Sequence, residues 1–366
     1  MEEPKDKVFT VTQKTPPTDI EEIKKFHSLG TFGKFFTDHM AIASWNIEEG
    51  WHNFEIKPRD VFQIAPENMI FHYGQEIFEG MKAFYTKDHE IVLFRPEQNA
   101  KRFNNSAKRL AMPSLPEEIF LSAVENLVKI DKAWVPKVEG ASLYIRPFMY
   151  ANENSLGLGA AKNYSFCVIA CPVGSYFKTT NRCLKLWVEP EYSRAASGGT
   201  GAAKCGGNYA ASVIALNKAY EKGCDQVLFL DAKEKKWIEE LGGMNIFFIT
   251  HDKKFITPPL NGNILPGITR DSILQIAQSL NYKTDEKAYS LEQLLHDIKN
   301  RIVTEAFACG TAASVAPIGE IHHNHGKICI NDASEGPLTK EVRLKLINIQ
   351  TGYDKDEKNW CKKVTI

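Results

Sequence analysis

The sequence predicts a protein of two domains, each containing both strands and helices. The chain has 366 residues, and ~150 residues per domain is usual, so its length favours two domains. Hydrophobic residues make up 43% and charged residues 25%, which is ordinary globular composition. Residues 173–181 are small or polar, lie near the midpoint and separate two strand-like runs. We therefore expect a smaller domain 1–172, a linker 173–181 and a larger domain 182–366.

Apolar runs and helical periodicities alternate through the first half of the chain. Apolar residues recur at helical spacing after Pro116, at Phe120, Ala123, Val124 and Leu127, and predict a helix. The expected elements are strand 40–45, extended segment 79–84, strand 90–94, a turn at 95–99 leading into a helix, helix 116–132, and strands 141–151 and 164–172. Tyr144 and Arg146 are two apart on one expected strand and so share a face, although Arg146 could equally form a structural salt bridge.

The second half continues the same mixture. Gly223 ends an expected helix that begins at Asn208. The expected elements are strands 183–188, 226–231 and 246–250, and helices 208–221, 271–280, 291–300 and 338–351. Glu240 lies where the chain enters a Gly-Gly turn, a position that usually holds an acid facing water. Gly267, Ile268 and Thr269 could bind an anion at a helix start, or Thr269 or Asp271 could simply cap that helix.

Composition and charge argue against several classes of partner. Lys+Arg and Asp+Glu both total 45, which gives no overall attraction to nucleic acid or to an anionic membrane. No window approaches the ~18 consecutive apolar residues of a membrane span. The acidic N-terminus predicts a cytoplasmic location, or a mitochondrial one if a presequence precedes this numbering.

Cysteine and histidine spacing does not predict a metal site. The eight cysteines are scattered without a CxxC pair, which fits reduced thiols. The histidines of 322–325 are expected in a surface turn, and His39 is expected to be a hydrogen-bonded structural residue.

One lysine stands between two glycine clusters, in the stretch Gly-Gly-Thr-Gly-Ala-Ala-Lys-Cys-Gly-Gly-Asn-Tyr at 198–209. Glycine lets the backbone approach a ligand closely, so this setting suggests that the Lys204 amine is held in an enclosed site. Partial desolvation would lower the pKa of that amine and favour Schiff-base chemistry with a carbonyl. The alternative is a flexible loop carrying a solvated lysine.

Other candidates complete the requirements of one cofactor. Pyridoxal 5′-phosphate needs an amine, an acid at its ring nitrogen, and a phosphate site made of N–H groups, hydroxyls and an arginine. Candidates for these parts are Lys204, Glu240, Ile268, Thr269, Thr311 and Arg102. Arg102 could instead be a solvated charge on a helix face.

Four stretches resemble the branched-chain-amino-acid aminotransferases, which belong to fold type IV of the pyridoxal-phosphate enzymes. They are Phe-Glu-Gly-Met-Lys-Ala (78–83), Tyr-Ile-Arg-Pro (144–147), the lysine stretch 198–209 and Glu-Leu-Gly-Gly-Met-Asn (240–245). The resemblance runs from about Phe32 to the C-terminus, and the longer, eukaryotic form of the family is the nearest match. It implies an α/β fold (mixed α+β) of two domains, with the active site between them, in a homodimer.

The resemblance also implies a role for each matching residue. Lys204 would form the Schiff base and shuttle protons, Tyr209 would bond the cofactor's phenolic oxygen, and Glu240 would pair with the pyridine nitrogen. The phosphate would be held by Arg102, Ile268, Thr269 and Thr311. The substrate pocket would be lined by Phe32, Phe78, Tyr144, Arg146 and Tyr176, with Ala312 near the substrate carboxylate and Tyr73 supplied across the dimer interface. Arg146 would meet the side-chain carboxylate of glutamate.

Two positions depart from the family pattern. Ala313 and Ala316 replace the redox-active CxxC of mammalian members, so thiol regulation of that kind is not expected. Gly243 replaces a threonine near the substrate carboxylate and removes one hydroxyl donor.

The expected activity is the reversible transfer of the amino group of leucine, isoleucine or valine to 2-oxoglutarate. A D-amino-acid transaminase or aminodeoxychorismate lyase of the same fold is one alternative, and a non-catalytic metabolite-binding homologue is another.

Overall fold

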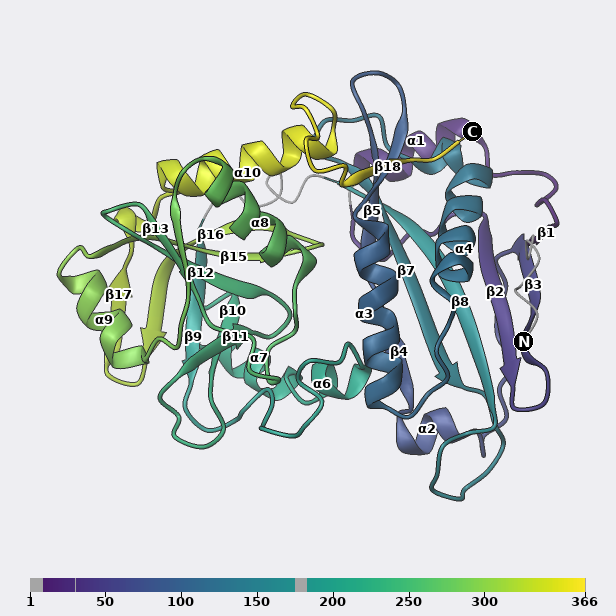
Figure 1. Ribbon diagram of the computed structural model, residues 1–366, viewed down its shortest axis with the longest axis horizontal. Coiled ribbons are helices and arrows are strands. Elements are labelled where there is room, and N and C mark those ends of the chain that lie inside the picture. The colour runs from purple at the N-terminus through teal and green to yellow at the C-terminus, as the bar shows by residue number, and fades with distance from the viewer. Residues whose placement is uncertain (1–8, 30, 175–182, 366) are drawn as a thin grey trace. The chain divides into compact units, whose positions relative to one another are not determined.

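The computed structural model describes residues 9–29, 31–174 and 183–365. The chain divides into two compact units. The first contains residues 1–176 and 349–366, and the second contains residues 177–348 (Figure 1).

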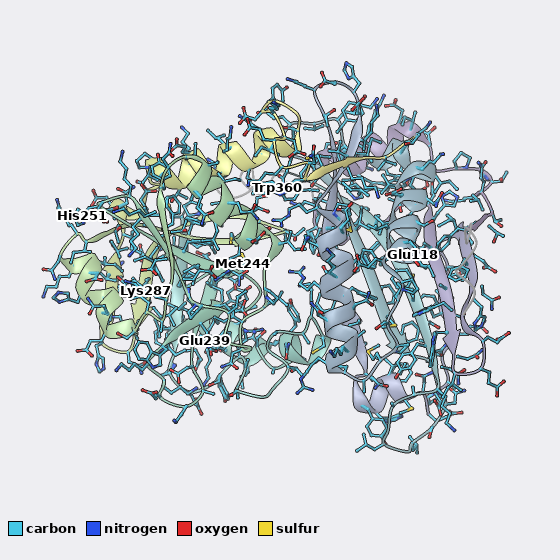
Figure 2. The ribbon with its side chains drawn as sticks, viewed as in Figure 1. Glu118, Glu239, Met244, His251, Lys287 and Trp360 are labelled. Atoms are coloured by element: carbon cyan, nitrogen blue, oxygen red, sulfur yellow. The ribbon has the colours of Figure 1, made fainter. Side chains whose placement is uncertain are left out.

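This division differs from the expected domains at the C-terminal end. We expected all residues after 181 in a larger second domain, but strand β18 (Cys361–Lys363) pairs with β6 (Ile91–Phe94) in the first unit. Trp360, labelled in Figure 2, lies edge-on to Phe94 with ring centroids 5.7 Å apart. The expected linker falls mostly outside the described residues, so its limits stay a prediction.

The first unit contains a nine-stranded sheet among its described residues, in the order β1-β3-β2-β8-β7-β5-β6-β18, with β4 paired to β7. Its other strands are β1 (Thr10–Val11), β2 (His39–Asn46), β3 (Gly50–Pro58), β4 (Glu76–Phe78), β5 (Met81–Tyr85), β7 (Ser142–Ala151) and β8 (Asn163–Val173). Its helices are α1 (Ile20–Leu29), α2 (Met69–Tyr73), α3 (Pro96–Arg109), α4 (Glu117–Ile130) and the 3₁₀ helix η1 (Lys132–Trp134).

The two faces of this sheet have different environments. Leu143, Ile145 and Met149 alternate along β7 and are fully buried. On β8, Phe166 pairs with Met149, and its ring contacts Phe103 of α3 and Phe120 of α4 at centroid distances of 5.6 and 6.1 Å. Helices α3 and α4 therefore cover this face. Because side chains alternate along a strand, Tyr144 and Arg146 lie on the other face, as expected.

The start of β2 is held by a buried polar group. His39 Nδ1 lies 2.6 Å from Asp131 Oδ1, and the Lys14 amide donates to His39 Nε2 at 2.9 Å. The expectation of a structural, hydrogen-bonded histidine is confirmed. Next to it, Asp38 accepts bonds from the Lys14 amine and the Thr18 amide, which tie residues 14–18 to this strand.

The second unit has its own nine-stranded sheet among the described residues, in the order β11-β10-β9-β16-β15-β12-β13-β14, with β17 paired to β16. The strands are β9 (Leu184–Glu189), β10 (Gln226–Leu230), β11 (Ile238–Leu241), β12 (Asn245–Thr250), β13 (Lys254–Thr257), β14 (Lys283–Glu286), β15 (Val303–Gly310), β16 (Ser314–His323) and β17 (Gly326–Cys329). The helices are α6 (Gly206–Ala210), α7 (Val213–Glu221), α8 (Ile268–Ser279), α9 (Leu291–Lys299), η2 (Asn331–Ala333) and α10 (Pro337–Gln350), the last of which ends in the first unit.

Strand β12 is buried along its whole length and lies between β13 and β15. Phe247 stacks on Phe307 of β15 with ring centroids 5.0 Å apart. Burying a phenylalanine side chain contributes roughly 1.5–3 kcal/mol to the free energy of unfolding, so this pair stabilises the pairing of β12 with β15.

Two expected elements of the second unit are wrong in their limits. The helix expected at 208–221 is two helices, because the Ser212 hydroxyl donates to the Tyr209 carbonyl at 2.7 Å and competes with the helical bonding. The helix expected at 271–280 begins at Ile268, three residues early.

Other expectations on the second unit hold. The histidine tract 322–325 ends β16 and forms the hairpin turn to β17, as expected for a surface turn.

In the parts of the chain that the structure describes, no helix is long and apolar enough to cross a membrane.

Candidate active site

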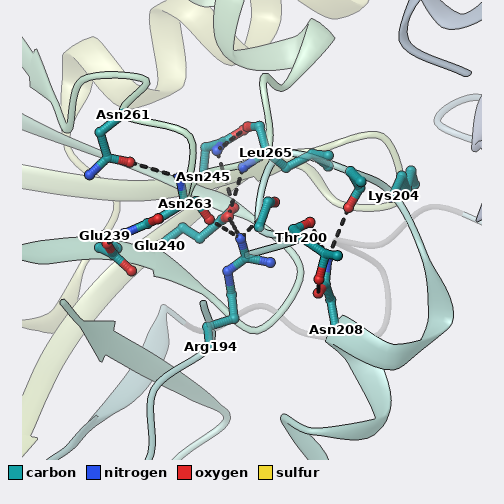
Figure 3. A network of polar contacts seen from close by, with 12 residues as sticks. Arg194, Thr200, Lys204, Asn208, Glu239, Glu240, Asn245, Asn261, Asn263 and Leu265 are labelled. Carbon is teal, nitrogen blue, oxygen red and sulfur yellow. Dashed lines mark hydrogen bonds and ion pairs between the residues drawn. The ribbon is translucent and has the colours of Figure 1, made fainter. Parts of the chain in front are cut away.

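Lys204 lies on a loop that is hydrogen-bonded to the helix after it. Asn208 of α6 donates to the carbonyls of Thr200 and Ala203 at 2.8 and 2.9 Å, and the Thr200 hydroxyl donates to Asn208 Oδ1 at 2.6 Å (Figure 3). A Cβ on Gly201 would come within 2.2 Å of the Asn263 carbonyl oxygen, so glycine is needed here for close packing. The loop is thus packed in place, unlike the flexible loop of the alternative interpretation.

The Lys204 amine points at the hydroxyl group of Tyr209. Its Nζ donates to the Tyr209 hydroxyl at 2.7 Å, and Lys204 is partly buried. Helix α6 begins at Gly206, so Tyr209 stands on the first turn after the loop and its side chain can reach back to the amine. The structure therefore brings together the amine and the phenol to which the resemblance gave roles at one cofactor, and those roles stay predictions.

Glu240 is a buried acid on strand β11, so the alternative of a loop acid facing water is wrong. Its side chain is 3% exposed, and Oε1 pairs with Arg194 Nη2 at 2.6 Å. The Leu265 amide donates to Oε1 at 2.9 Å, and Asn245 Nδ2 donates to Oε2 at 3.3 Å (Figure 3). These groups fix both oxygens of the carboxylate.

Burial raises the pKa of Glu240 to about 7, although the charge of Arg194 and the bond from the Leu265 amide oppose that rise. The charge of Lys204 also lowers the pKa of Glu240. The amine of Lys204 and the acid of Glu240 therefore lie close enough for the charge of one to affect the other.

Helix α8 begins without a side-chain cap. Its N-cap is Gly267, so the alternative that Thr269 or Asp271 caps the helix is wrong. The N-terminus of a helix carries partial positive charge and favours an anion such as phosphate. Ile268 and Thr269 occupy the first turn, where their N–H groups are expected to meet the phosphate.

The turn after β15 lies close to the turn before β12 and to Tyr209. A Cβ on Gly310 would lie 3.7 Å from the Gly243 carbonyl oxygen, and a Cβ on Gly243 would lie 3.6 Å from Tyr209 Cε1. Thr311 and Ala312 follow Gly310 directly in this turn. The glycine contacts therefore link the turn that carries Thr311 to the segment after Glu240 and to Tyr209, the partner of Lys204.

Arg102 lies on α3 of the first unit and is almost fully buried. Its Nε and Nη2 donate to the two oxygens of Glu79 at 2.7 and 2.8 Å, and Asn99 Nδ2 donates to Glu79 Oε2 at 2.7 Å. The alternative of a solvated helix-face charge is wrong. Its contact with a phosphate stays a prediction.

Three of the expected substrate residues of the first unit surround Tyr144. The Phe32 ring is edge-on to the Tyr144 ring at 5.0 Å, and Arg146 Nη2 donates to the Tyr144 hydroxyl at 3.1 Å. The Arg146 guanidinium lies 4.7 Å from the centre of the Phe78 ring. Among residues 9–29, 31–174 and 183–365 no carboxylate pairs with Arg146, so the structural salt bridge of the alternative is not found.

The other expected substrate residues are Tyr73, Ala312 and Tyr176. Tyr73 ends α2, and its hydroxyl donates to the Leu156 carbonyl. Ala312 is exposed in its turn, and Tyr176 lies outside the described residues. Their roles stay predictions.

The sequence did not reveal three residues that hold the site together. Arg194 and Asn245 bind Glu240, and Glu79 binds Arg102. Arg194 lies far from Glu240 in the sequence, with no motif joining the two. Asn245 and Glu79 lie inside quoted stretches, but only the fold shows what they contact.

Comparison with known families agrees with this geometry. A family model described as amino-transferase class IV matches residues 76–321, which include the Lys204 loop, Glu240 and the turn at Thr311. The chain belongs to this family.

Two similar proteins are bacterial. The branched-chain-amino-acid aminotransferase of Mycolicibacterium smegmatis is 43% identical over 96% of this chain and 97% of its own length. A probable branched-chain-amino-acid aminotransferase of Streptomyces coelicolor is 45% identical over 90% of this chain and 91% of its own. The resemblance to this group of aminotransferases is confirmed, while the expected closeness to the eukaryotic form stays a prediction.

A solved structure supports the fold. The branched-chain amino acid aminotransferase from Escherichia coli superposes with a TM-score of 0.72 at 26% identity. The match covers 89% of this chain and 100% of that one. The predicted fold, a type IV aminotransferase of mixed strands and helices, is confirmed.

Proposed function

We propose that this aminotransferase moves the amino group of branched-chain L-amino acids to 2-oxoglutarate, with pyridoxal 5′-phosphate as cofactor. The observation that carries the chemistry is the pairing of Lys204 with Tyr209 beside the buried Glu240. The choice of substrates is supported by the similar proteins, which are named branched-chain-amino-acid aminotransferases at 43 and 45% identity.

The residues of the second unit fit the cofactor by their chemistry. An amine, a phenol, a buried acid with a cationic partner, and a helix start with glycine at its N-cap are groups that suit pyridoxal 5′-phosphate. Lys204, Tyr209, Glu240, Ile268, Thr269 and Thr311 would hold it, with Arg102 adding a cation to the phosphate. When bound, the cofactor supplies an aldehyde that condenses with amines and a ring that withdraws electrons.

The chain's own groups then have distinct tasks. Lys204 Nζ moves the proton of the substrate Cα, and its bond to the Tyr209 hydroxyl keeps the amine oriented. Glu240 presents its carboxylate to the ring nitrogen. The Arg194 cation stabilises the ionised form of Glu240 within the protein interior.

The substrate side chain would meet the group around Tyr144. Phe32, Phe78 and Tyr144 give an apolar lining that suits leucine, isoleucine and valine, but one methylene changes binding by only ~1–3 kcal/mol. Arg146, held against Tyr144 and Phe78, would meet the second carboxylate of glutamate. A homodimer, with Tyr73 shared across its interface, and a cytoplasmic location complete the proposal.

Transamination assays with purified protein test this function. We expect turnover of L-leucine with 2-oxoglutarate, none of D-alanine, and a visible absorption band that shifts when leucine is added. Lys204→Ala should lose both turnover and the shift. Lys218→Ala, a surface lysine of the same unit paired with Glu191, is the matched control and should keep both. Turnover of D-alanine alone, or activity that survives Lys204→Ala, would reject the proposal.

A further inference from the structure

Asn245 makes two hydrogen bonds that join separate segments of the second unit. It is the first residue of β12 and is 5% exposed. Its Nδ2 donates to Glu240 Oε2 at 3.3 Å and to the Leu265 carbonyl at 3.1 Å (Figure 3). One amide group thus contacts both strand β11 and the segment that leads into helix α8.

The other end of the same amide lies against the start of α8. A Cβ on Gly267 would be 2.0 Å from Asn245 Oδ1 and 3.2 Å from Cγ. Gly267 has φ −68° and ψ 129°, a backbone conformation open to any residue. Glycine is therefore required at the N-cap because the Asn245 side chain occupies the space, and not because of backbone strain.

The segment before α8 also binds Glu240 directly, through the Leu265 amide at 2.9 Å. Glu240, Asn245 and Leu265 consequently form one hydrogen-bonded group, and Gly267 packs against its Asn245 side chain. Asn245 is uncharged, so it fixes the Glu240 carboxylate without replacing the charge that Arg194 supplies. Asn245 therefore determines where the Glu240 carboxylate lies, and not its charge.

From this geometry we propose that Asn245 is a positioning residue that holds the acid and the helix start at the separation the cofactor requires. Glu240 would meet the ring nitrogen at one end of a rigid molecule, and the N-terminus of α8 would meet the phosphate at another. If the two contacts move apart by about 1 Å, a rigid ligand that must make both of them binds more weakly. This inference rests on the proposed function and adds to it a residue that sets the geometry of the site.

The test compares the whole cofactor with a part of it. Cofactor-free full-length protein is titrated with pyridoxal 5′-phosphate, followed by absorbance, and separately with inorganic phosphate, followed by calorimetry. In Asn245→Ala we expect affinity for pyridoxal 5′-phosphate to fall roughly 10- to 100-fold, the usual effect of losing hydrogen bonds to a charged group. Affinity for inorganic phosphate should change less than about 3-fold, because a small ion needs only the helix start.

Two further variants make the result specific. Gly267→Ala should reproduce the same difference between cofactor and phosphate, since its added methyl displaces the Asn245 amide, and it keeps the test open if Asn245→Ala fails to fold. Asn263→Ala is the matched control, because this buried side chain bonds Glu239 at 2.7 Å rather than Glu240. It should leave affinity for pyridoxal 5′-phosphate within about 3-fold of the parent protein.

The outcomes separate the inference from the proposed function. If Asn245→Ala lowers the affinities for pyridoxal 5′-phosphate and for inorganic phosphate equally, Asn245 only supports the helix locally, and the inference is overturned. It is also overturned if the affinity for pyridoxal 5′-phosphate is unchanged in both Asn245→Ala and Gly267→Ala. If the parent protein itself does not bind pyridoxal 5′-phosphate, the proposed function fails instead.

Discussion

Replacing Arg194 by methionine should destabilise the protein by an amount that depends on pH. Arg194 is the cationic partner of the buried Glu240, at 2.6 Å, and also donates to the Gly201 carbonyl at 2.9 Å. Removing one member of a buried ion pair typically costs ~3–5 kcal/mol when the other charge stays buried. Glu240 can avoid part of this cost by taking up a proton, because burial has already raised its pKa to about 7.

The direction of the pH effect follows from proton linkage. The folded-state pKa of Glu240 lies above its ordinary value of 4.5, so its contribution to stability is greatest at low pH and declines as pH rises to about 7. Without Arg194 the pKa rises further, and the decline continues above pH 7. Each pH unit then costs the variant about 1.4 kcal/mol more than the parent, or about 2 kcal/mol between pH 7 and 8.5.

Urea unfolding at pH 6 and pH 8.5 measures this difference in the free energy of unfolding. The cofactor is removed first, because it would itself interact with Glu240. Four proteins are compared: the parent, Arg194→Met, Glu240→Gln and the double variant. In the Glu240→Gln background the acid paired with Arg194 is gone, so most of the pH dependence of the Arg194→Met effect should vanish. The remainder belongs to Glu239, because burial raises its pKa and the charge of Arg194 lowers it. A loss that is equal at both pH values, or a pH dependence as large in the double variant as in Arg194→Met, would refute the reasoning.

Three other predictions follow from individual contacts. Gly80→Ala should raise the KM for leucine about 10-fold or more, because the new Cβ would lie 2.1 Å from the Tyr144 hydroxyl oxygen and must displace that ring. Steady-state kinetics measure this change, and an unchanged KM would count against Tyr144 as a substrate contact. Asp38→Asn should expose residues 14–18 to protease near neutral pH, and limited proteolysis measures this. The bonds from Lys14 and Thr18 hold the pKa of Asp38 at about 2, so the stability that they contribute is present above pH 3.8 and is lost as pH falls towards 2. The parent protein should therefore show the same exposure in strong acid. Gly201→Ala should lower the melting temperature and weaken cofactor binding together, since its Cβ would overlap a backbone carbonyl at 2.2 Å; calorimetry and absorbance titration on the same sample test whether the two effects coincide.

Several strands of the first unit were predictable because one face of each is more buried than the other, whereas β1, β3, α1 and α2 were not expected. Alternation along 141–151 separates Leu143 and Ile145, in the core, from Tyr144 and Arg146. Strands β15 and β16 escaped the sequence analysis. Their residues are buried on both faces, so alternation is lost, and each strand contains glycine or proline, which in a sequence usually indicates a turn.

The site divides in the same way between local and distant contacts. Lys204 and Tyr209 are neighbours on one loop and helix start, but it was the resemblance to a family, and not their spacing, that named Tyr209 as a site residue. Glu240 comes from a strand and Thr311 from a turn after another strand, and only the pairing of β12 with β15 brings those segments together. No local pattern reports such a pairing, so the set was proposed from the groups that one cofactor requires, and the resemblance to a family added Tyr209.

The pairing of β18 with β6 has a practical consequence for work with fragments. A fragment ending near residue 172 would lack the strand that covers β6, a run of four buried apolar residues, Ile91–Phe94. An uncovered apolar edge recruits other chains, so such a fragment should aggregate. Joining residues 349–366 to it through a short flexible linker would supply the missing strand, and the same pairing argues for placing purification tags at the N-terminus.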